Sequence, residues 1–284
     1  MSRILALIDA SIYAESVCDH AAWAAERLGW PINLLHVLGK PETGGLPLNL
    51  SGNLTVDGRD ALLKDLAEHD AQRARLAQQR GRVVLEAART RIEHGGIDDV
   101  SATLRHGDFV ETFEELAGEA SIGILGKRGE AADFAKGHLG SNLERAVRAS
   151  PIPLLVTSRA FRPINSVVVA FDGGTSAAKA VAYLADSPLF EGTTVSLLTV
   201  GRIDATGHRA REAALNLLSR NGFSPQAIEL EGDPAAGIAG HVESEGVDML
   251  VMGAYGHSRI RTLVIGSTTS EMLRACRVPV LMFR

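Results

Sequence analysis

The sequence predicts an α/β protein of two tandem domains, each built on an open, twisted parallel sheet with helices on both faces. Its 284 residues suit two domains of about 150 residues each. Asp9 aligns with Asp172 and Val37 with Val200 at one offset of 163 residues, which indicates an internal repeat. Within each repeat, short apolar runs alternate with helical segments, which is typical of parallel sheets in α/β proteins.

The strands are clearest in the second repeat, where short apolar runs are separated by turns and helical segments. There we expect strands at 166–171, 195–200, 227–230, 249–252 and 280–283. In the first repeat we expect strands at 4–8, 34–37 and 152–156. Asp108 and Asp233 each precede a helical segment, and Pro234 follows Asp233 directly. Both aspartates are therefore predicted helix N-caps.

The first repeat carries sequence that the second lacks. Residues 38–57 are rich in Gly, Pro and Asn, and a charged run rich in Ala and Leu follows at about 60–91 with helical spacing. The corresponding helix of the second repeat is short, at about 208–221. The long helix is either a solvent-facing helix that covers the sheet or a lid or partner surface, and the sequence leaves both interpretations open.

The domain boundaries follow from the repeats. We expect a first domain at 1–158, a linker at 159–165 and a second domain at 166–284. The linker is placed there because it follows the last strand of one repeat and precedes the first strand of the next.

Composition excludes several classes of protein. The net charge is -5 and no basic cluster stands apart from compensating acids, which argues against a nucleic-acid partner. The two cysteines, Cys18 and Cys276, suit neither a disulfide framework nor a zinc site, so we expect a cytoplasmic protein. The apolar run at 4–8 is interrupted by Asp9 before it reaches signal-peptide length. The sequence contains no stretch of about 18 uncharged apolar residues, so no membrane-spanning helix is predicted.

The most informative stretch is a glycine-rich loop near the end of the chain. Met252 and Gly253 end a buried strand, Gly256 follows, and after nine more residues Gly266 and Ser267 open a helix. Glycines at the carboxyl end of a parallel strand let the backbone approach a phosphate. The N-terminus of the following helix directs free N–H groups and its positive dipole end toward an anion. The loop therefore predicts a polyphosphate site.

Other residues are expected on the same rim of the sheet. Asp172 follows the first strand of the second repeat and could accept from a ribose hydroxyl or an adenine amino group, although a plain turn aspartate is the alternative. Val200 ends the second strand and offers an apolar wall for a base. Arg259, with Arg261 and His257 nearby in the loop, could pair with phosphate oxygens.

The motif Gly253-x2-Gly256-x9-Gly266-Ser267, together with Asp172 and the glycine after it, resembles the ATP-binding motif of universal stress proteins. The resemblance covers nearly the whole chain as a tandem pair, apart from 38–91. It implies an adenine nucleotide alpha-hydrolase-like fold, with five parallel strands per domain in the order 3-2-1-4-5, and ATP held by the loop. The implied nucleotide contacts are Asp172, Val200, Met252, Gly253, Gly256, Gly266, Ser267 and Thr268.

The first repeat departs from this motif. Ten residues, rather than nine, separate Gly129 from Gly140, and Asp9 is followed by Ala10 in place of glycine. Lys127 and Arg128 bring positive charge to the loop, whereas Glu130 and Asp133 bring negative charge. The first domain could therefore bind nucleotide, bind another small ligand or serve only as a pairing surface. Its candidate site residues are Asp9, Val37, Gly126, Gly129, Gly140 and Ser141.

These observations favour a cytoplasmic stress-response protein that binds ATP in its second domain and acts through nucleotide-dependent association. The sequence has neither a Gly-x4-Gly-Lys-Ser/Thr loop nor a Gly-x-Ser-x-Gly motif, so we assign no catalytic residues and expect slow hydrolysis at most. A slow ATPase or a nucleotide-dependent enzyme on the same fold is the alternative. Whether Mg²⁺ accompanies ATP stays open.

Two further expectations concern partners and metals. The resemblance implies that the closing strands at 152–156 and 280–283 pair the two domains within one chain, and it leaves a homodimer open. The nine histidines include no ligand-spaced pair such as His-x3-His, so no metal site is predicted. His36 is the histidine to examine, because it lies near a strand end at the expected ligand rim.

Overall fold

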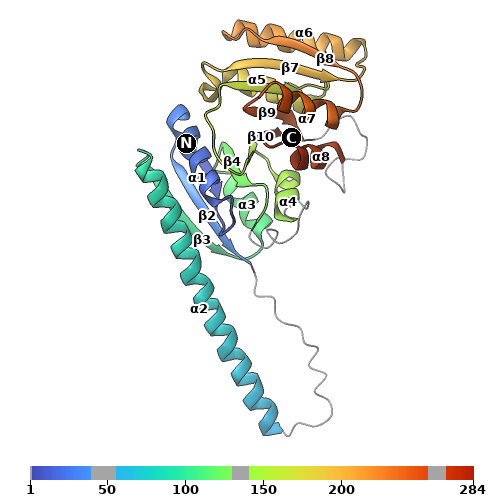
Figure 1. Ribbon diagram of the computed structural model, residues 1–284. Helices are drawn as coiled ribbons and strands as arrows, with labels where there is room; N and C mark the ends of the chain where they lie inside the picture. The colour runs from blue at the N-terminus through green and yellow to red at the C-terminus, as the bar shows by residue number, and fades with distance from the viewer. Residues whose placement is uncertain (1, 40–55, 130–140, 255–266) are drawn as a thin grey trace.

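The computed structural model describes residues 2–39, 56–129, 141–254 and 267–284 of the chain (Figure 1). Within these residues the strands form one sheet in the order β3-β2-β1-β4-β5-β10-β9-β6-β7-β8. Each half of the chain supplies five neighbouring strands in the order 3-2-1-4-5, as the resemblance implies. The pairs inside each half are parallel, as predicted for an α/β fold.

The eight strands whose bounds were predicted lie within two residues of them, and the structure adds β3 and β4, for which no bounds were predicted. In chain order they are β1 (Ile4–Leu7), β2 (Ile32–Leu38), β3 (Val100–His106), β4 (Ile122–Gly126), β5 (Leu154–Thr157), β6 (Ser166–Ala170), β7 (Thr194–Val200), β8 (Gln226–Leu230), β9 (Met249–Gly253) and β10 (Val280–Phe283). Residues 159–165 lie between β5 and β6 and form neither helix nor strand. The exact domain boundaries remain a prediction.

The helices cover both faces of the sheet. They are α1 (Ala14–Leu28), α2 (Val56–His94), α3 (Phe109–Ala117), α4 (Ser141–Ala149), α5 (Thr175–Asp186), α6 (Ala205–Arg220), α7 (Pro234–Ser244) and α8 (Ser267–Ala275). Side chains of α1, α2, α5 and α6 belong to one apolar core, and those of α3, α4, α7 and α8 belong to the other. Each core lies on one side of the sheet, because residues of a strand point alternately to its two faces.

The two halves meet where β5 pairs with β10, and this pair is antiparallel, with Val280 opposite Val156 and Met282 opposite Leu154. The predicted pairing of the closing strands within one chain is therefore confirmed. Leu155 and Leu281 belong to one core, and their strand neighbours belong to the other. Both cores thus continue across the junction of the halves.

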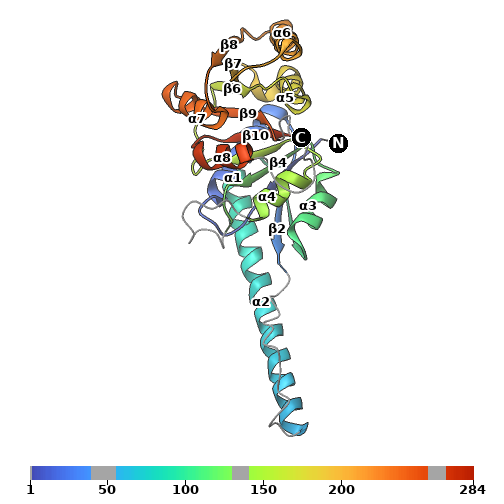
Figure 2. The same ribbon diagram turned by 90° about the vertical axis from the view of Figure 1, so that its right-hand side faces the viewer.

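The inserted helix α2 is longer than predicted and differs along its length in what it touches. It has 39 residues and is therefore about 58 Å long. Leu85, Ala88 and Ile92 are buried in the core, whereas Leu76 is more than half exposed. Figures 1 and 2 show the outer part of α2 projecting well away from the sheet. The prediction of a helix that covers the sheet therefore holds only for its C-terminal part.

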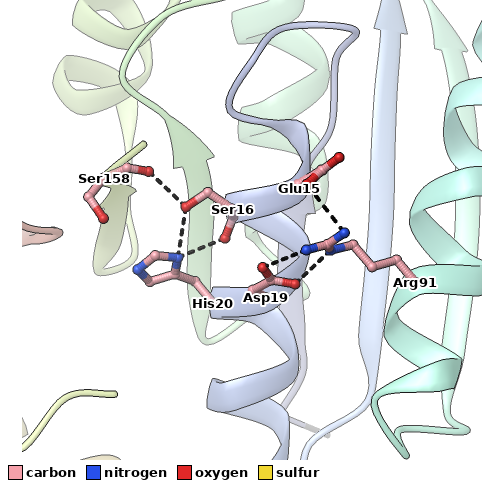
Figure 3. A network of polar contacts seen from close by, with 6 residues as sticks. All are labelled: Glu15, Ser16, Asp19, His20, Arg91 and Ser158. Carbon is pink, nitrogen blue, oxygen red and sulfur yellow. Dashed lines mark hydrogen bonds and ion pairs between the residues drawn. The ribbon is translucent and has the colours of Figure 1, made fainter. Parts of the chain in front are cut away.

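Polar contacts attach α1 to α2 on one side and to the residue that follows β5 on the other (Figure 3). The Arg91 guanidinium donates to both carboxylate oxygens of Asp19, at 2.7 and 2.9 Å, and lies 3.3 Å from Glu15. On the other side of α1, the Ser16 hydroxyl donates to the Ser158 carbonyl at 2.7 Å. These long-range contacts hold the insertion and the residue just before the linker against the same helix.

The predicted helix starts are confirmed. Asp108 accepts hydrogen bonds from the backbone N–H groups of Val110 and Glu111, and Asp233 accepts one from that of Ala236 at 2.9 Å. Asp108 also accepts two bonds from Arg145 of α4, so one carboxylate caps α3 and joins it to the next helix. Across the described parts of the chain, each helix is too short or too polar to span a bilayer.

Candidate functional site

In the second half, register brings the predicted rim residues to the same level of the sheet. Ala170 of β6 pairs with Leu198 of β7 and with Met252 of β9. Asp172 follows β6 by two residues and Val200 is the last residue of β7, so both lie at the carboxyl edge where parallel α/β sheets bind ligands. Gly253 ends β9 beside them. The Met252 side chain is buried in the core below this rim, so the groups it could offer a ligand are those of its backbone.

Asp172 is exposed and holds a turn. Its Oδ1 accepts from the backbone N–H of Gly174 at 2.8 Å, and Gly173 between them has a φ of +79°. Asp9 in the first half does the same, because its Oδ1 accepts from the N–H of Ser11 at 3.0 Å. Both aspartates therefore have the structural role of holding a turn. Because the turn holds one carboxylate oxygen, it also fixes the position of the other.

The first glycine of each loop has a packing role that sequence reasoning missed. A Cβ on Gly253 would lie 2.9 Å from the Ser176 Cβ, and one on Gly126 would lie 2.6 Å from the Tyr13 Cβ. These glycines let α5 and α1 begin close against strands β9 and β4. The sequence prediction assigned both to the approach of a phosphate, because a single sequence does not distinguish a glycine that admits a phosphate from one that admits a neighbouring helix.

The two ends of the second-half loop are joined directly. The Thr269 hydroxyl, in the first turn of α8, donates to the Ala254 carbonyl at 2.7 Å, just beyond β9. This bond holds the start of α8 next to the strand end. The predicted contact residues Gly256, Arg259 and Gly266 lie outside the described residues. Ser267 and Thr268 are placed at the start of α8, but their side chains also fall outside the description.

The first half has a small cavity at the corresponding rim. Its volume is about 100 Å³, and the residues around it include Asp9, Val37, Gly126 and Gly129, four of the six predicted there. Arg128 lines the same cavity. Gly140 falls outside the described residues, as does the side chain of Ser141, the first residue of α4. A cavity of this volume is smaller than the about 300–1,000 Å³ typical of small-molecule sites.

Lys127 does not serve the first-half site as its charge suggested. Its side chain is buried, and its Nζ donates to the backbone carbonyl of Cys276 at the end of α8. Burial lowers the pKa of Lys127 to about 8, although the Cys276 thiol acts in the opposite direction. No pattern in the sequence indicates this contact, because its acceptor is a main-chain oxygen 149 residues away.

His36 is a structural residue of this rim. Its Nδ1–H donates to the Ile8 carbonyl at 2.6 Å, which fixes the tautomer, and the ring is buried. The ring also lines a second cavity of about 330 Å³ between β2 and α2, beside Leu76 and Arg80. Within the described parts of the chain, no group of three or more His, Cys, Asp or Glu side chains is arranged to hold a metal ion.

Comparison with known proteins covers the whole chain. The sequence model of the Universal stress protein family matches residues 1–158 and 201–284. Universal stress protein Slr1230 of Synechocystis is 37% identical over 287 residues, which is 100% of both chains. Universal stress protein YxiE of Bacillus subtilis is 25% identical over 146 residues, 42% of this chain and 99% of its own.

Solved structures share the fold over nearly the full length. A universal stress protein from Archaeoglobus fulgidus has a TM-score of 0.71 at 20% identity, covering 99% of this chain and 98% of its own. Protein PA1789 from Pseudomonas aeruginosa has a TM-score of 0.65 at 18% identity, covering 100% of this chain and 92% of its own. At these identities the structures establish the α/β fold and its tandem arrangement.

Proposed function

Because the chain belongs to the universal stress protein family, we propose that it binds ATP in its second half and acts in the cytoplasmic stress response through nucleotide-dependent association. One observation carries the proposal. The glycine motif begins at the end of β9 with Gly253 and ends at the start of α8 with Ser267, and Asp172 and Val200 lie at the ends of the neighbouring strands β6 and β7.

The described residues of the second half fit the parts of an adenine nucleotide. The first turn of α8 supplies N–H groups with no acceptor inside the helix, which suit phosphate oxygens. The exposed Asp172 carboxylate suits a ribose hydroxyl or an adenine amino group, and Val200 supplies an apolar contact for the base. The described residues offer no carboxylate cluster for Mg²⁺, so we assign no protein ligand to that ion.

We expect one ATP per chain. The cavity of the first half, at about 100 Å³, is smaller than a nucleotide requires. Its loop also has one residue more between the second and third glycines than the motif of the second half. Asp9 and Arg128 at this cavity would suit a smaller polar ligand, which is the role we propose for this half.

Paired substitutions test the assignment. Asp172→Asn keeps an oxygen for the Gly174 N–H but replaces the second carboxylate oxygen by an amide group. We expect ATP affinity, measured by calorimetry, to fall about tenfold or more. Asp9→Asn makes the same change at the other rim and should leave ATP affinity unchanged. Equal effects of the two changes, or none from Asp172→Asn, would refute the assignment.

A second pair of variants tests the loop itself. Gly266→Val places a branched side chain in the motif, so we expect it to abolish ATP binding while the unfolding temperature stays near that of the wild type. Gly140→Val is the matched change in the first half and should leave ATP binding intact. Mass spectrometry of ligand released from the denatured wild-type protein gives an independent check. If no adenine nucleotide copurifies with the protein and none binds on titration, the proposal fails.

Turnover and association separate a binding protein from an enzyme. Steady ATP hydrolysis that disappears in Gly266→Val would favour the ATPase alternative. If the nucleotide acts as a ligand, sedimentation with and without ATP should instead show a change in association state or partner binding without product release. Sedimentation without ATP also tests the homodimer, against which a strict monomer at micromolar concentration would count.

A further inference from the structure

Each helix that follows a glycine loop is held at its far end by a cation from the opposite half. The Nζ of Lys127, in the first half, donates to the carbonyl of Cys276 at the C-terminus of α8. The guanidinium of Arg284, in the second half, donates to the carbonyl of Arg148 in the last turn of α4. The two contacts cross the β5–β10 junction in opposite directions, although Lys127 follows β4 and Arg284 follows β10, so the two cations do not occupy equivalent positions of their halves.

A cation at the C-terminus of a helix stabilises that helix. The last four carbonyls of a helix have no acceptor role inside it, and they carry the negative end of the helix dipole. A cation there satisfies one carbonyl and stabilises the helix. Lys127 is only 8% exposed, so water competes little for its bond. Arg148 is exposed, so the contact of Arg284 is the weaker of the two.

The other ends of the same two helices lie at the candidate sites. Helix α8 begins at Ser267, where the second-half loop ends, and α4 begins at Ser141, where the first-half loop ends. Lys127 itself directly follows Gly126, which lines the first-half cavity. A single side chain therefore joins the loop of one half to the phosphate-facing helix of the other.

We propose that Lys127 is a positioning residue for the nucleotide site of the opposite half, and that Arg284 plays the weaker counterpart role for α4. This inference rests on the proposed ATP site at the start of α8. With the C-terminus of α8 held, the N–H groups of its first turn stay where the phosphates need them. A ligand that moves the loop after β4 would shift Lys127 and so change affinity across the junction.

The test is Lys127→Met, which keeps an unbranched side chain but removes the cation and the donor. We expect the Kd for ATP at pH 7 to rise about fivefold, the size typical of a charge at a helix terminus. Amide hydrogen exchange in α8 should become faster even without nucleotide. Lys179→Met is the matched control, because Lys179 donates to the Arg284 carbonyl within the second half. It should change neither quantity.

A pH series separates positioning from simple packing. The pKa of Lys127 is about 8, and in the described residues the titratable group acting on it is the Cys276 thiol, whose pKa burial raises to about 11. The cation is therefore lost as pH rises from 7 to 9 while the thiol stays neutral. The difference in Kd between wild type and Lys127→Met should narrow over this range. A constant difference would overturn the role of the charge.

The remaining outcomes are decisive. If Lys127→Met binds ATP like the wild type and α8 exchanges at the same rate, the inference is wrong while the proposed function stands. If the wild type binds no ATP, the proposed function fails and with it the link to affinity. The exchange rate of α8 without nucleotide then still decides whether Lys127 holds this helix.

Discussion

His20 should make the stability of the protein sensitive to mild acid. The residue lies on α1 with its side chain fully buried, and its Nδ1–H donates to the Ser16 carbonyl at 2.7 Å. The other ring nitrogen, Nε2, is buried without a hydrogen-bond partner among the described residues. The ring packs edge to face with Phe161, with 5.0 Å between the two ring centroids. A proton on Nε2 would therefore enter an apolar site with no acceptor.

The magnitude follows from the shift in pKa. Burial is the main cause that lowers the pKa of His20 from 6.5 to about 4, against smaller opposing effects of the Ser16 backbone and Asp19. The folded state then keeps a neutral ring where the unfolded chain binds a proton. Stability is full above pH 6.5 and is lost as pH falls toward 4. Between pH 7 and pH 5 the loss is about 2 kcal/mol from this residue alone.

The assay compares urea unfolding of wild type and His20→Leu at pH 7 and pH 5. Leucine cannot titrate, so the variant should lose about 2 kcal/mol less over this interval, whatever its stability at pH 7. His208→Leu is the control, because His208 is exposed on α6 and its removal should leave the pH dependence nearly unchanged. Equal losses for wild type and His20→Leu would show that the buried ring does not control acid stability.

Three further substitutions test local packing, helix propensity and helix capping. Gly253→Ala should lower thermal stability by about 1–3 kcal/mol, because its Cβ would lie 2.9 Å from the Ser176 Cβ. Gly240→Ala, in an exposed and open position of α7, should instead raise it by about 0.5–1 kcal/mol. Asp108→Ala should cost about 1 kcal/mol at neutral pH through loss of the α3 cap. Arg145 and the helix amides lower the pKa of Asp108, so the loss of stability caused by Asp108→Ala should shrink as pH falls through that pKa. Urea titrations in which this loss stays constant with pH would contradict the prediction.

The fold was predictable from the sequence because its signals are local and occur twice. Short apolar runs located eight of the ten described strands within two residues, and Asp108 and Asp233 marked helix starts through their own side chains. The common rim of Asp172 and Val200 followed from their places at the ends of two predicted strands. These features depend on neighbours within a few residues, which a single sequence displays.

The features that were missed depend on contacts between distant segments. The bond from Lys127 to the Cys276 carbonyl, the fit of Gly253 against Ser176 and the attachment of Ser16 to Ser158 each involve partners 77 to 149 residues apart. A main-chain acceptor or a close approach of two backbones leaves no pattern in one sequence. The projecting part of α2 was missed for a similar reason, because helical spacing does not say where a helix stops touching the body.

The antiparallel contact of β5 with β10 joins two segments of one polypeptide, so dilution cannot separate them. Two identical subunits meeting in this way would have to carry the same residue on both sides. Here the position after the first loop glycine is Lys127 in one half and Ala254 in the other. Within a single chain, by contrast, equivalent positions of the two halves can carry different residues, so a contact made on one side of the junction need not be repeated on the other.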